Sequence, residues 1–219
     1  MMTILFQGDS LTDACGEKDR GVNDPNKKLG VEYVNFIAQY LMSKDPQIQV
    51  LNHGVNGSRI TDLYAKWKDD VLKIDFHILS ILCGVNDVRF SLRMNQRTDT
   101  EEFGFLYDKM LYEVKKEKPE TILVLCEPFL FKLNRDEVTY GTDIIDDWEQ
   151  WDASIREQAI VVRKLAAKYG AVLVPGRKLF ADACQKAPAS HWSVDGIHLT
   201  VAGNGLLARE WLRCMKGIL

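Results

Sequence analysis

Three groups of small polar residues, each containing glycine, follow predicted strands of this sequence and could carry out chemistry. They are Gly8-Asp9-Ser10-Leu11, the segment from Asn52 to Arg59, and Gly84-Val85-Asn86-Asp87. In open α/β sheets, ligands bind beyond the carboxyl ends of the strands, where the strand order reverses. A serine there can act as a nucleophile, and backbone or amide N–H groups can stabilise an oxyanion. The three groups together therefore indicate acyl-transfer chemistry.

A serine hydroxyl needs a general base, and His198 is the best candidate. It stands in Asp195-Gly196-Ile197-His198, three residues after a carboxylate. One turn of chain lets the carboxylate accept a hydrogen bond from Nδ1 while Nε2 points towards the serine. An Asp-x-x-His sequence by itself is more typical of an Asx-turn or a helix cap, so this prediction depends on the other three groups.

The other three histidines fit catalysis less well. His77 lies within an apolar run, which favours a hydrogen-bonded place in the core or at a strand edge. His53 ends a predicted strand but has no carboxylate at a useful spacing, and only its closeness to His198 supports His191.

Five short apolar runs without alternation predict strands that are buried on both faces of a parallel sheet. They are Thr3–Phe6, Ile48–Leu51, Phe76–Cys83, Thr121–Cys126 and Ala171–Val174. Between them, apolar residues recur at helical spacing. These stripes run through residues 31–41, 60–71, 103–114, 155–169 and 206–215, and Pro119 and Gly170 mark the ends of the third and fourth. Alternating strands and helices predict an α/β fold.

The chain is expected to form a single domain over residues 1–219, because no repeat, linker or low-complexity tract divides it. Two segments, Thr12–Leu29 and Pro128–Asp147, are longer than ordinary connections. They are either loops that line a site or surface decoration, and the sequence favours neither.

Composition excludes several classes of function. The formal net charge of −3 provides no field that would attract nucleic acid. No apolar stretch approaches the ~20 residues of a membrane span, and the N-terminus lacks the basic region of a signal peptide. The five cysteines form no Cys-x-x-Cys pair and are interpreted as packing residues in a reducing compartment. We therefore expect a cytoplasmic protein, and the sequence makes no prediction of its oligomeric state.

The four groups, taken in chain order, resemble the SGNH (GDSL-type) hydrolase superfamily. Gly8-Asp9-Ser10-Leu11 resembles its nucleophile block, Gly57 its second-block glycine, Gly84-x-Asn86-Asp87 the third block and Asp195-x-x-His198 the last. Ser58 and Leu199 depart from residues common in relatives, without touching the chemistry. The resemblance implies a flavodoxin-like three-layer α/β/α sandwich with a five-stranded parallel sheet in the order 2-1-3-4-5, as the strand pattern also predicts.

The resemblance also implies the roles of individual residues. Ser10 would be the nucleophile, His198 the base and then the acid, and Asp195 the group that fixes the imidazole tautomer. The backbone N–H groups of Ser10 and Gly57, with the side chain of Asn86, would form the oxyanion hole. The expected activity is hydrolysis of a small-molecule carboxylic ester through an acyl-enzyme intermediate, with no metal or cofactor.

Further residues could contact the substrate. Asp9 is the neighbour of the nucleophile, Trp192 lies three residues before Asp195, and Phe129 lies in the turn that ends the fourth strand. Trp148 and Trp151 are expected in the core, and Arg89, Arg93 and Arg97 on a solvated loop. The preferred substrate is a short acyl group, such as acetyl, on a polar or carbohydrate alcohol.

Three alternatives remain open. One is a lysophospholipase or thioesterase of the same fold. Another is a non-catalytic domain that binds a small molecule, since a fold alone does not imply activity. The third is a metallophosphoesterase, for which Gly8-Asp9 and Asn86-Asp87 could supply metal ligands, although the sequence has only four histidines.

Overall fold

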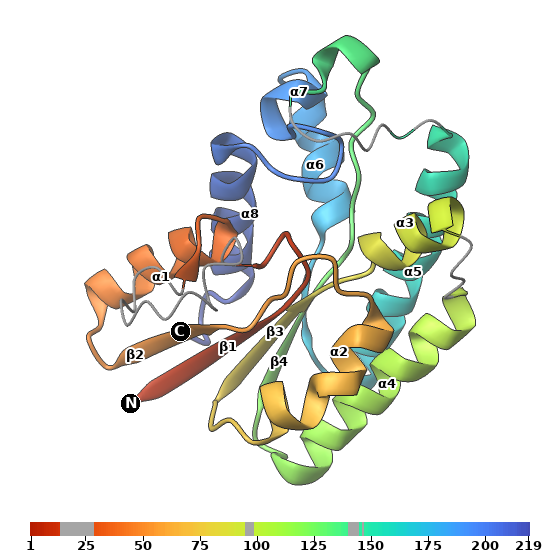
Figure 1. The fold of residues 1–219 in the computed structure, drawn as a ribbon. Coiled ribbons are helices and arrows are strands. Elements are labelled where there is room, and N and C mark those ends of the chain that lie inside the picture. The colour runs from red at the N-terminus through yellow and green to blue at the C-terminus, as the bar shows by residue number, and fades with distance from the viewer. Residues whose placement is uncertain (14–28, 95–98, 140–144, 146) are drawn as a thin grey trace.

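A five-stranded parallel sheet forms the centre of the molecule in the computed structural model, which describes residues 1–13, 29–94, 99–139, 145 and 147–219 (Figure 1). The strand order is β2-β1-β3-β4-β5, and every neighbouring pair is parallel. The predicted fold class and strand order are therefore confirmed. The strands are β1 (Met2–Gly8), β2 (Ile48–Asn52), β3 (Ile78–Leu82), β4 (Ile122–Cys126) and β5 (Val172–Val174).

Helices cover both faces of the sheet (Figure 1). On one face lie α1 (Tyr33–Lys44), α6 (Gly176–Cys184) and α8 (Val201–Cys214). On the other lie α2 (Ile60–Trp67), α4 (Thr100–Glu117) and α5 (Trp148–Tyr169). The remaining elements of the described chain are a π-helical turn (Lys68–Leu72), α3 (Val85–Met94), a 3-10 turn (Arg135–Glu137) and α7 (Ala189–Trp192).

The apolar runs located all five strands but overextended the third. That strand was predicted from Phe76 to Cys83, whereas β3 begins at Ile78 and ends at Leu82. His77 lies at the strand edge, where its backbone N–H donates to the Thr3 carbonyl at 2.9 Å and its Nδ1 accepts from the Thr3 N–H at 3.1 Å. An apolar run indicates which residues are buried, and burial here extends beyond the ends of the β3 strand.

The predicted helical stripes are found in α1, α2, α4, α5 and α8, with one error at their margin. Val31 is 62% exposed because α1 begins only at Tyr33. Gly170 ends α5 in the left-handed conformation at φ 60°, as its position predicts. The apolar spacing did not predict α3, α6 or α7. In α3 the buried first turn contains Asn86 and Asp87, so burial there produces no apolar pattern.

Two apolar clusters, one on each face, fix the sheet. On the α1–α8 face, the Trp211 ring lies 5.3 Å from the Phe6 ring, and its Nε1 donates to the Ser80 hydroxyl at 3.0 Å. Cys83 and Cys126 are buried, in accord with a packing role, whereas Cys184 is exposed. This packing fixes the central strands β1 and β3, whose carboxyl ends carry the polar groups predicted to form the site.

No helix in the described part of the chain combines the length and the apolar composition needed to cross a bilayer.

Candidate active site

A tight turn after β1 presents Ser10 at the carboxyl edge of the sheet. The Asp9 carbonyl accepts hydrogen bonds from the N–H groups of Thr12 and Asp13 at 3.0 and 2.9 Å, and Asp9 Oδ1 accepts from Leu11 N–H at 3.0 Å. A Cβ atom at Gly8 would lie 2.1 Å from the Leu82 carbonyl oxygen. The glycine is therefore required where the turn leaves β1 close against β3.

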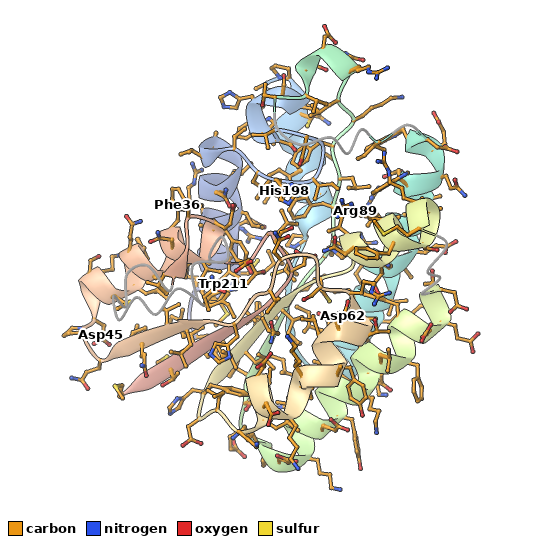
Figure 2. All side chains as sticks on the ribbon, viewed as in Figure 1. Phe36, Asp45, Asp62, Arg89, His198 and Trp211 are labelled. Carbon is orange, nitrogen blue, oxygen red and sulfur yellow. The ribbon has the colours of Figure 1, made fainter. Side chains whose placement is uncertain are left out.

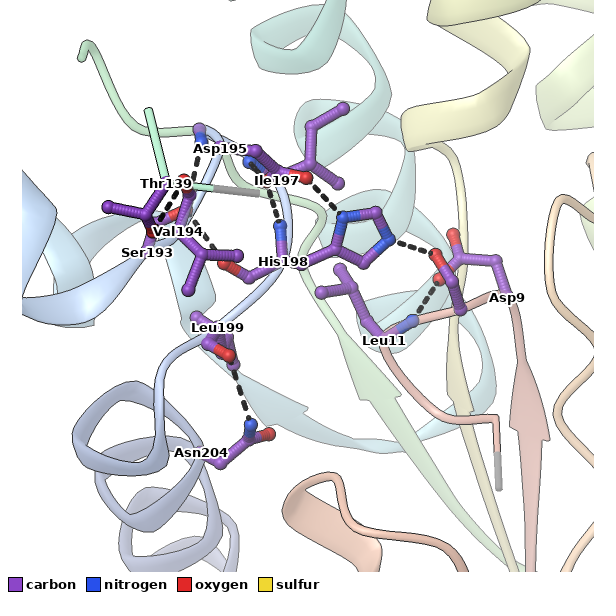
Figure 3. A network of polar contacts seen from close by, with 12 residues as sticks. Asp9, Leu11, Thr139, Ser193, Val194, Asp195, Ile197, His198, Leu199 and Asn204 are labelled. Atoms are coloured by element: carbon purple, nitrogen blue, oxygen red, sulfur yellow. Dashed lines mark hydrogen bonds and ion pairs between the residues drawn. The ribbon is translucent and has the colours of Figure 1, made fainter. Parts of the chain in front are cut away.

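The loop that carries His198 is held by hydrogen bonds among its own residues (Figure 3). Asp195 Oδ1 accepts from the N–H groups of Ile197 and His198 at 2.8 and 2.7 Å. The Ser193 hydroxyl donates to the His198 carbonyl at 2.8 Å and accepts from the Gly196 N–H at 2.9 Å. Asp195 thus forms an Asx-turn and still has its second oxygen free to meet the imidazole.

A continuous hydrogen-bond chain joins the three predicted catalytic residues. His198 Nε2 lies 2.8 Å from Ser10 Oγ, and His198 Nδ1 lies 2.5 Å from Asp195 Oδ2. The Asp195 side chain is 5% exposed and that of His198 is 34% exposed, so the carboxylate is shielded while the imidazole reaches the site. The hydrogen bond to Asp195 raises the pKa of His198 above its ordinary value of 6.5, against the opposing effect of burial.

The predicted oxyanion donors come from three separate segments. Neither the Ser10 nor the Gly57 backbone N–H donates a hydrogen bond to another described residue. Asn86 Nδ2 donates to the Ser58 carbonyl at 3.2 Å, and an amide nitrogen carries a second hydrogen. Each of the three groups therefore has a hydrogen available for a further acceptor.

The two glycines of the second group have different structural roles. A Cβ atom at Gly57 would meet no protein atom within 4 Å. The backbone there has a φ of 78°, a region that is unfavourable for other residues. Close approach belongs to Gly54, whose Cβ would lie 2.8 Å from the backbone of Thr12 and Asp13.

Asn52 joins these segments, a role that the sequence did not predict. Its Nδ2 donates to the carbonyls of Thr12 and Leu29 at 2.6 and 3.1 Å, while its Oδ1 accepts from Gly54 N–H at 3.0 Å. The only signal was an amide side chain at the end of a buried strand, two residues before a glycine. Asp13 and Asp87 were also missed as residues that hold the site together.

Two of the three predicted substrate contacts, Asp9 and Phe129, are buried. Asp9 is 0% exposed, and burial raises its pKa to about 7. Its side chain stabilises the turn by accepting a hydrogen bond from the Leu11 N–H. Phe129 is 1% exposed and packs on Phe180, with ring centroids 4.5 Å apart. Trp192 is half-buried against the α1–α8 cluster. Direct contact of Asp9 and Phe129 with a substrate is therefore contradicted by their burial.

The remaining candidates have structural surroundings. His53 Nδ1 lies 2.8 Å from the Asp70 carbonyl, and His191 is exposed beside the Trp192 ring. Trp151 is buried as expected. Arg89 and Arg93 lie on α3 rather than on a loop, and Figure 2 shows Arg89 and His198 at the same edge of the sheet. Arg97 and most of Thr12–Leu29 lie outside the described residues, as do residues 140–144 and 146 of Pro128–Asp147.

This arrangement can carry out nucleophilic acyl transfer. It contains a hydroxyl bonded to an imidazole and a carboxylate that orients the imidazole. The residues lie between positions 10 and 198, and the parallel sheet brings them to one edge.

Known proteins share both the sequence pattern and the fold. The profile of the family described as "GDSL-like Lipase/Acylhydrolase" matches residues 6–206. An acetylxylan esterase from Geobacillus stearothermophilus is 26% identical over 96% of this chain and 92% of its own length. Its crystal structure superposes with a TM-score of 0.83 at 25% identity, covering 98% of this chain and 94% of that one. A GDSL-like lipase structure from Parabacteroides merdae gives a TM-score of 0.85 at 33% identity, covering 97% and 94%.

Proposed function

This chain belongs to the GDSL-like lipase/acylhydrolase family and is a carboxylic ester hydrolase, and we propose that it removes acetyl groups from carbohydrates with Ser10 as nucleophile. The observation that carries the proposal is the unbroken hydrogen-bond chain from Ser10 Oγ through His198 to Asp195. The acetylxylan esterase, similar over nearly the whole chain, supports the choice of acyl group and alcohol.

In the acylation step, His198 Nε2 takes the proton from Ser10 Oγ as that oxygen bonds to the acetyl carbonyl carbon. The carbonyl π electrons move to oxygen, which gives a tetrahedral oxyanion. When the oxyanion collapses, the bond to the alcohol oxygen breaks, and His198 returns its proton to that oxygen. The products are a free sugar hydroxyl and acetyl-Ser10.

Deacylation repeats the sequence with water as the nucleophile. His198 removes a proton from water, whose oxygen attacks the acetyl-Ser10 carbonyl. Collapse then releases acetate and restores the Ser10 hydroxyl. Asp195 remains ionised, holds the proton on Nδ1 and stabilises the imidazolium that forms in each step.

The oxyanion of both steps would be stabilised by the N–H groups of Ser10 and Gly57 and by Asn86 Nδ2. Gly57 lies three residues before α2, and Asn86 lies in the first turn of α3, so the N-terminal partial charges of both helices favour an anion there. A donor in such a place typically contributes about 10²–10³ in rate.

The test is a substrate panel with release of the carboxylic acid as readout, which is acetate for the acetyl esters. It compares acetylated xylo-oligosaccharides with 4-nitrophenyl esters of two to eight carbons, a lysophospholipid and an acyl thioester. We expect acetyl esters to be hydrolysed fastest and the carbohydrate to have the highest kcat/KM. A preference for long acyl chains or for the thioester would instead support the lysophospholipase or thioesterase alternative.

The catalytic role of the serine is tested with Ser10→Ala, with Ser43→Ala on the exposed surface of α1 as the matched control. We expect the first variant to lose turnover and labelling by a fluorophosphonate probe, and the second to keep both. A folded protein that resists labelling would indicate a non-catalytic binding domain, and loss of activity with a chelator would indicate the metallophosphoesterase alternative.

A further inference from the structure

Carboxylate side chains from two other parts of the chain hold the loop that carries Gly57 at both ends. Before the glycine, Asp13 Oδ2 accepts from the Asn56 N–H at 2.8 Å. After it, both carboxylate oxygens of Asp87 accept from the Ile60 N–H at 3.1 Å. Residues 56–60, which we call the oxyanion loop, are therefore held on either side of the proposed donor.

Asp87 ties the oxyanion loop to the other donor segment. It follows Asn86, whose Nδ2 donates to the Ser58 carbonyl at 3.2 Å, so two successive residues of α3 hold positions 58 and 60. The N-terminal N–H groups of a helix usually find partners within their own segment. In α2 the Arg59 N–H does so, donating to Asp62 at 3.0 Å, whereas the Ile60 N–H is satisfied from α3.

Asp13 ties the same loop to the nucleophile. It lies in the turn after Ser10, and its own N–H donates to the Asp9 carbonyl at 2.9 Å. One residue before Asn56, the Val55 N–H donates to the Gly8 carbonyl at 2.9 Å. The position of Gly57 relative to Ser10 is thus set by bonds on one side of the loop, and its position relative to Asn86 by bonds on the other.

A contribution to folding stability does not explain why the Asp87 carboxyl group is buried beside the Ile60 N–H. Asp87 is 0% exposed, and no ion pair joins it to a cation among the residues that the structure describes. Its burial, with the nearby charge of Asp9 adding to the effect, raises its pKa to about 7. Burying an unpaired carboxyl group costs free energy, whereas a single helix N–H could be satisfied by an exposed residue. A carboxylate at this position can instead align the Gly57 N–H for an oxyanion, which an exposed residue elsewhere could not do.

We propose that Asp13 and Asp87 are positioning residues that set the oxyanion hole by fixing the amide of Gly57 against Ser10 and Asn86. Neither residue has an assigned part in the chemical steps above, and the inference rests on the proposed function of Ser10 and Gly57. Because misaligned donors weaken only the transition state, loss of either carboxylate should lower kcat and leave KM nearly unchanged.

The experiment compares Asp87→Ala, Asp87→Asn and Asp13→Ala by steady-state hydrolysis of 4-nitrophenyl acetate and by inhibition with phenylboronic acid. Boronic acids form a tetrahedral adduct with a serine, so their affinity reports on the oxyanion hole. We expect kcat to fall about tenfold to a thousandfold in the two alanine variants, with weaker boronic acid inhibition in proportion. Asp87→Asn keeps one acceptor oxygen for Ile60 and should retain kcat within about threefold of the parent.

Asp99→Ala is the matched control, because Asp99 makes the same kind of bond, to the Glu102 N–H at 2.8 Å, at the N-terminus of α4 away from the site. Its kcat should equal that of the parent. Alanine variants that fold like this control and keep kcat and boronic acid affinity within about threefold of the parent would overturn the proposal. If Asp87→Ala does not fold, Asp13→Ala decides. Activity in Ser10→Ala would instead refute the proposed function itself.

Discussion

The loop that carries His198 and the oxyanion loop serve one site but are held in different ways. Within residues 193–199, the bonds span two to five positions, as between Asp195 and Ile197 or between Ser193 and His198. The oxyanion loop depends on Asp13, 43 positions before Asn56, and on Asp87, 27 positions after Ile60. The first loop is held mainly by bonds among its own residues, with further bonds from the Phe131 and Thr139 N–H groups to the Gly196 and Val194 carbonyls. The second depends on carboxylates from other elements.

This difference predicts where each part of the site is vulnerable. A local loop tolerates the loss of one bond, because several others span the same few residues. The oxyanion loop depends at each end on a carboxylate from a distant element, so a single substitution can move it. At equal loss of stability, variants of the oxyanion loop should therefore lose more catalytic rate than variants of the His198 loop.

The largest effect is expected for the triad itself. His198→Ala should reduce kcat by about 10⁴ or more, and Asp195→Asn by about 10⁴, because an asparagine favours the wrong imidazole tautomer. Asparagine keeps the Oδ1 acceptor for the Ile197 and His198 N–H groups, so the loop should stay folded. Steady-state kinetics with 4-nitrophenyl acetate measures both, and thermal unfolding checks the fold. Full activity in either variant would contradict the assigned base.

Asn86→Ala is expected to reduce kcat by about 10²–10³, since it removes one oxyanion donor together with the bond to the Ser58 carbonyl. The measurement is kcat against KM on the same ester. If KM rises while kcat stays constant, Asn86 binds the ground state and is not an oxyanion donor.

The pH dependence of kcat/KM tests the histidine loop without breaking it. Only neutral imidazole accepts the serine proton, and the pKa of His198 is raised above 6.5, so activity should rise with pH with a midpoint above 6.5. The charge of Glu32, held by Asn204 Nδ2 at 2.7 Å, contributes to this raised pKa. Glu32→Gln should therefore move the midpoint to lower pH. A flat profile between pH 5 and 8 would argue against His198 as the base.

Ser193→Ala tests how well the His198 loop tolerates the loss of one of its own hydrogen-bonding side chains. The hydroxyl is fully buried and bonded to both the His198 carbonyl and the Gly196 N–H, so its loss should cost about 1–3 kcal/mol of stability. The remaining bonds of Asp195 should keep the rate within about tenfold. If this variant loses more rate than Asp87→Ala at equal stability, the contrast between the two loops is wrong.

The last prediction concerns the dependence of stability on pH. Burial raises the pKa of Asp9 from its ordinary 3.8 to about 7, so the unfolded chain releases this proton more readily than the folded one. Stability is then lost as pH rises from about 4 to about 7, on the order of a few kcal/mol. Asp9→Asn should reduce the difference in Tm between pH 5 and pH 8. An unchanged difference would mean that Asp9 is ionised in the folded protein.

The same contrast explains what could be predicted from the sequence. Strands, helix stripes and the Asp195–His198 pair follow local spacing, and each was located from neighbouring residues. The burial of Asp9 and Phe129 and the tie from Asp87 to Ile60 depend on which segments the sheet brings together. The polar first turn of α3 gave no apolar pattern, so that helix was missed. Gly57 has a backbone φ of 78°, which its residue type permits but does not specify.

The contact between Trp211 and Phe6 has a consequence for biosynthesis. Phe6 belongs to the first strand and Trp211 to the last helix, which also bonds to Ser80 in the central strand. At about 5–20 residues per second, a ribosome needs roughly 10–40 s to make the chain between the two rings. For most of that time this face of the first strands lacks the cover of α8, and His198 has not been translated. Catalytic competence therefore requires synthesis to pass His198, and until α8 is made the nascent chain leaves part of this apolar face uncovered.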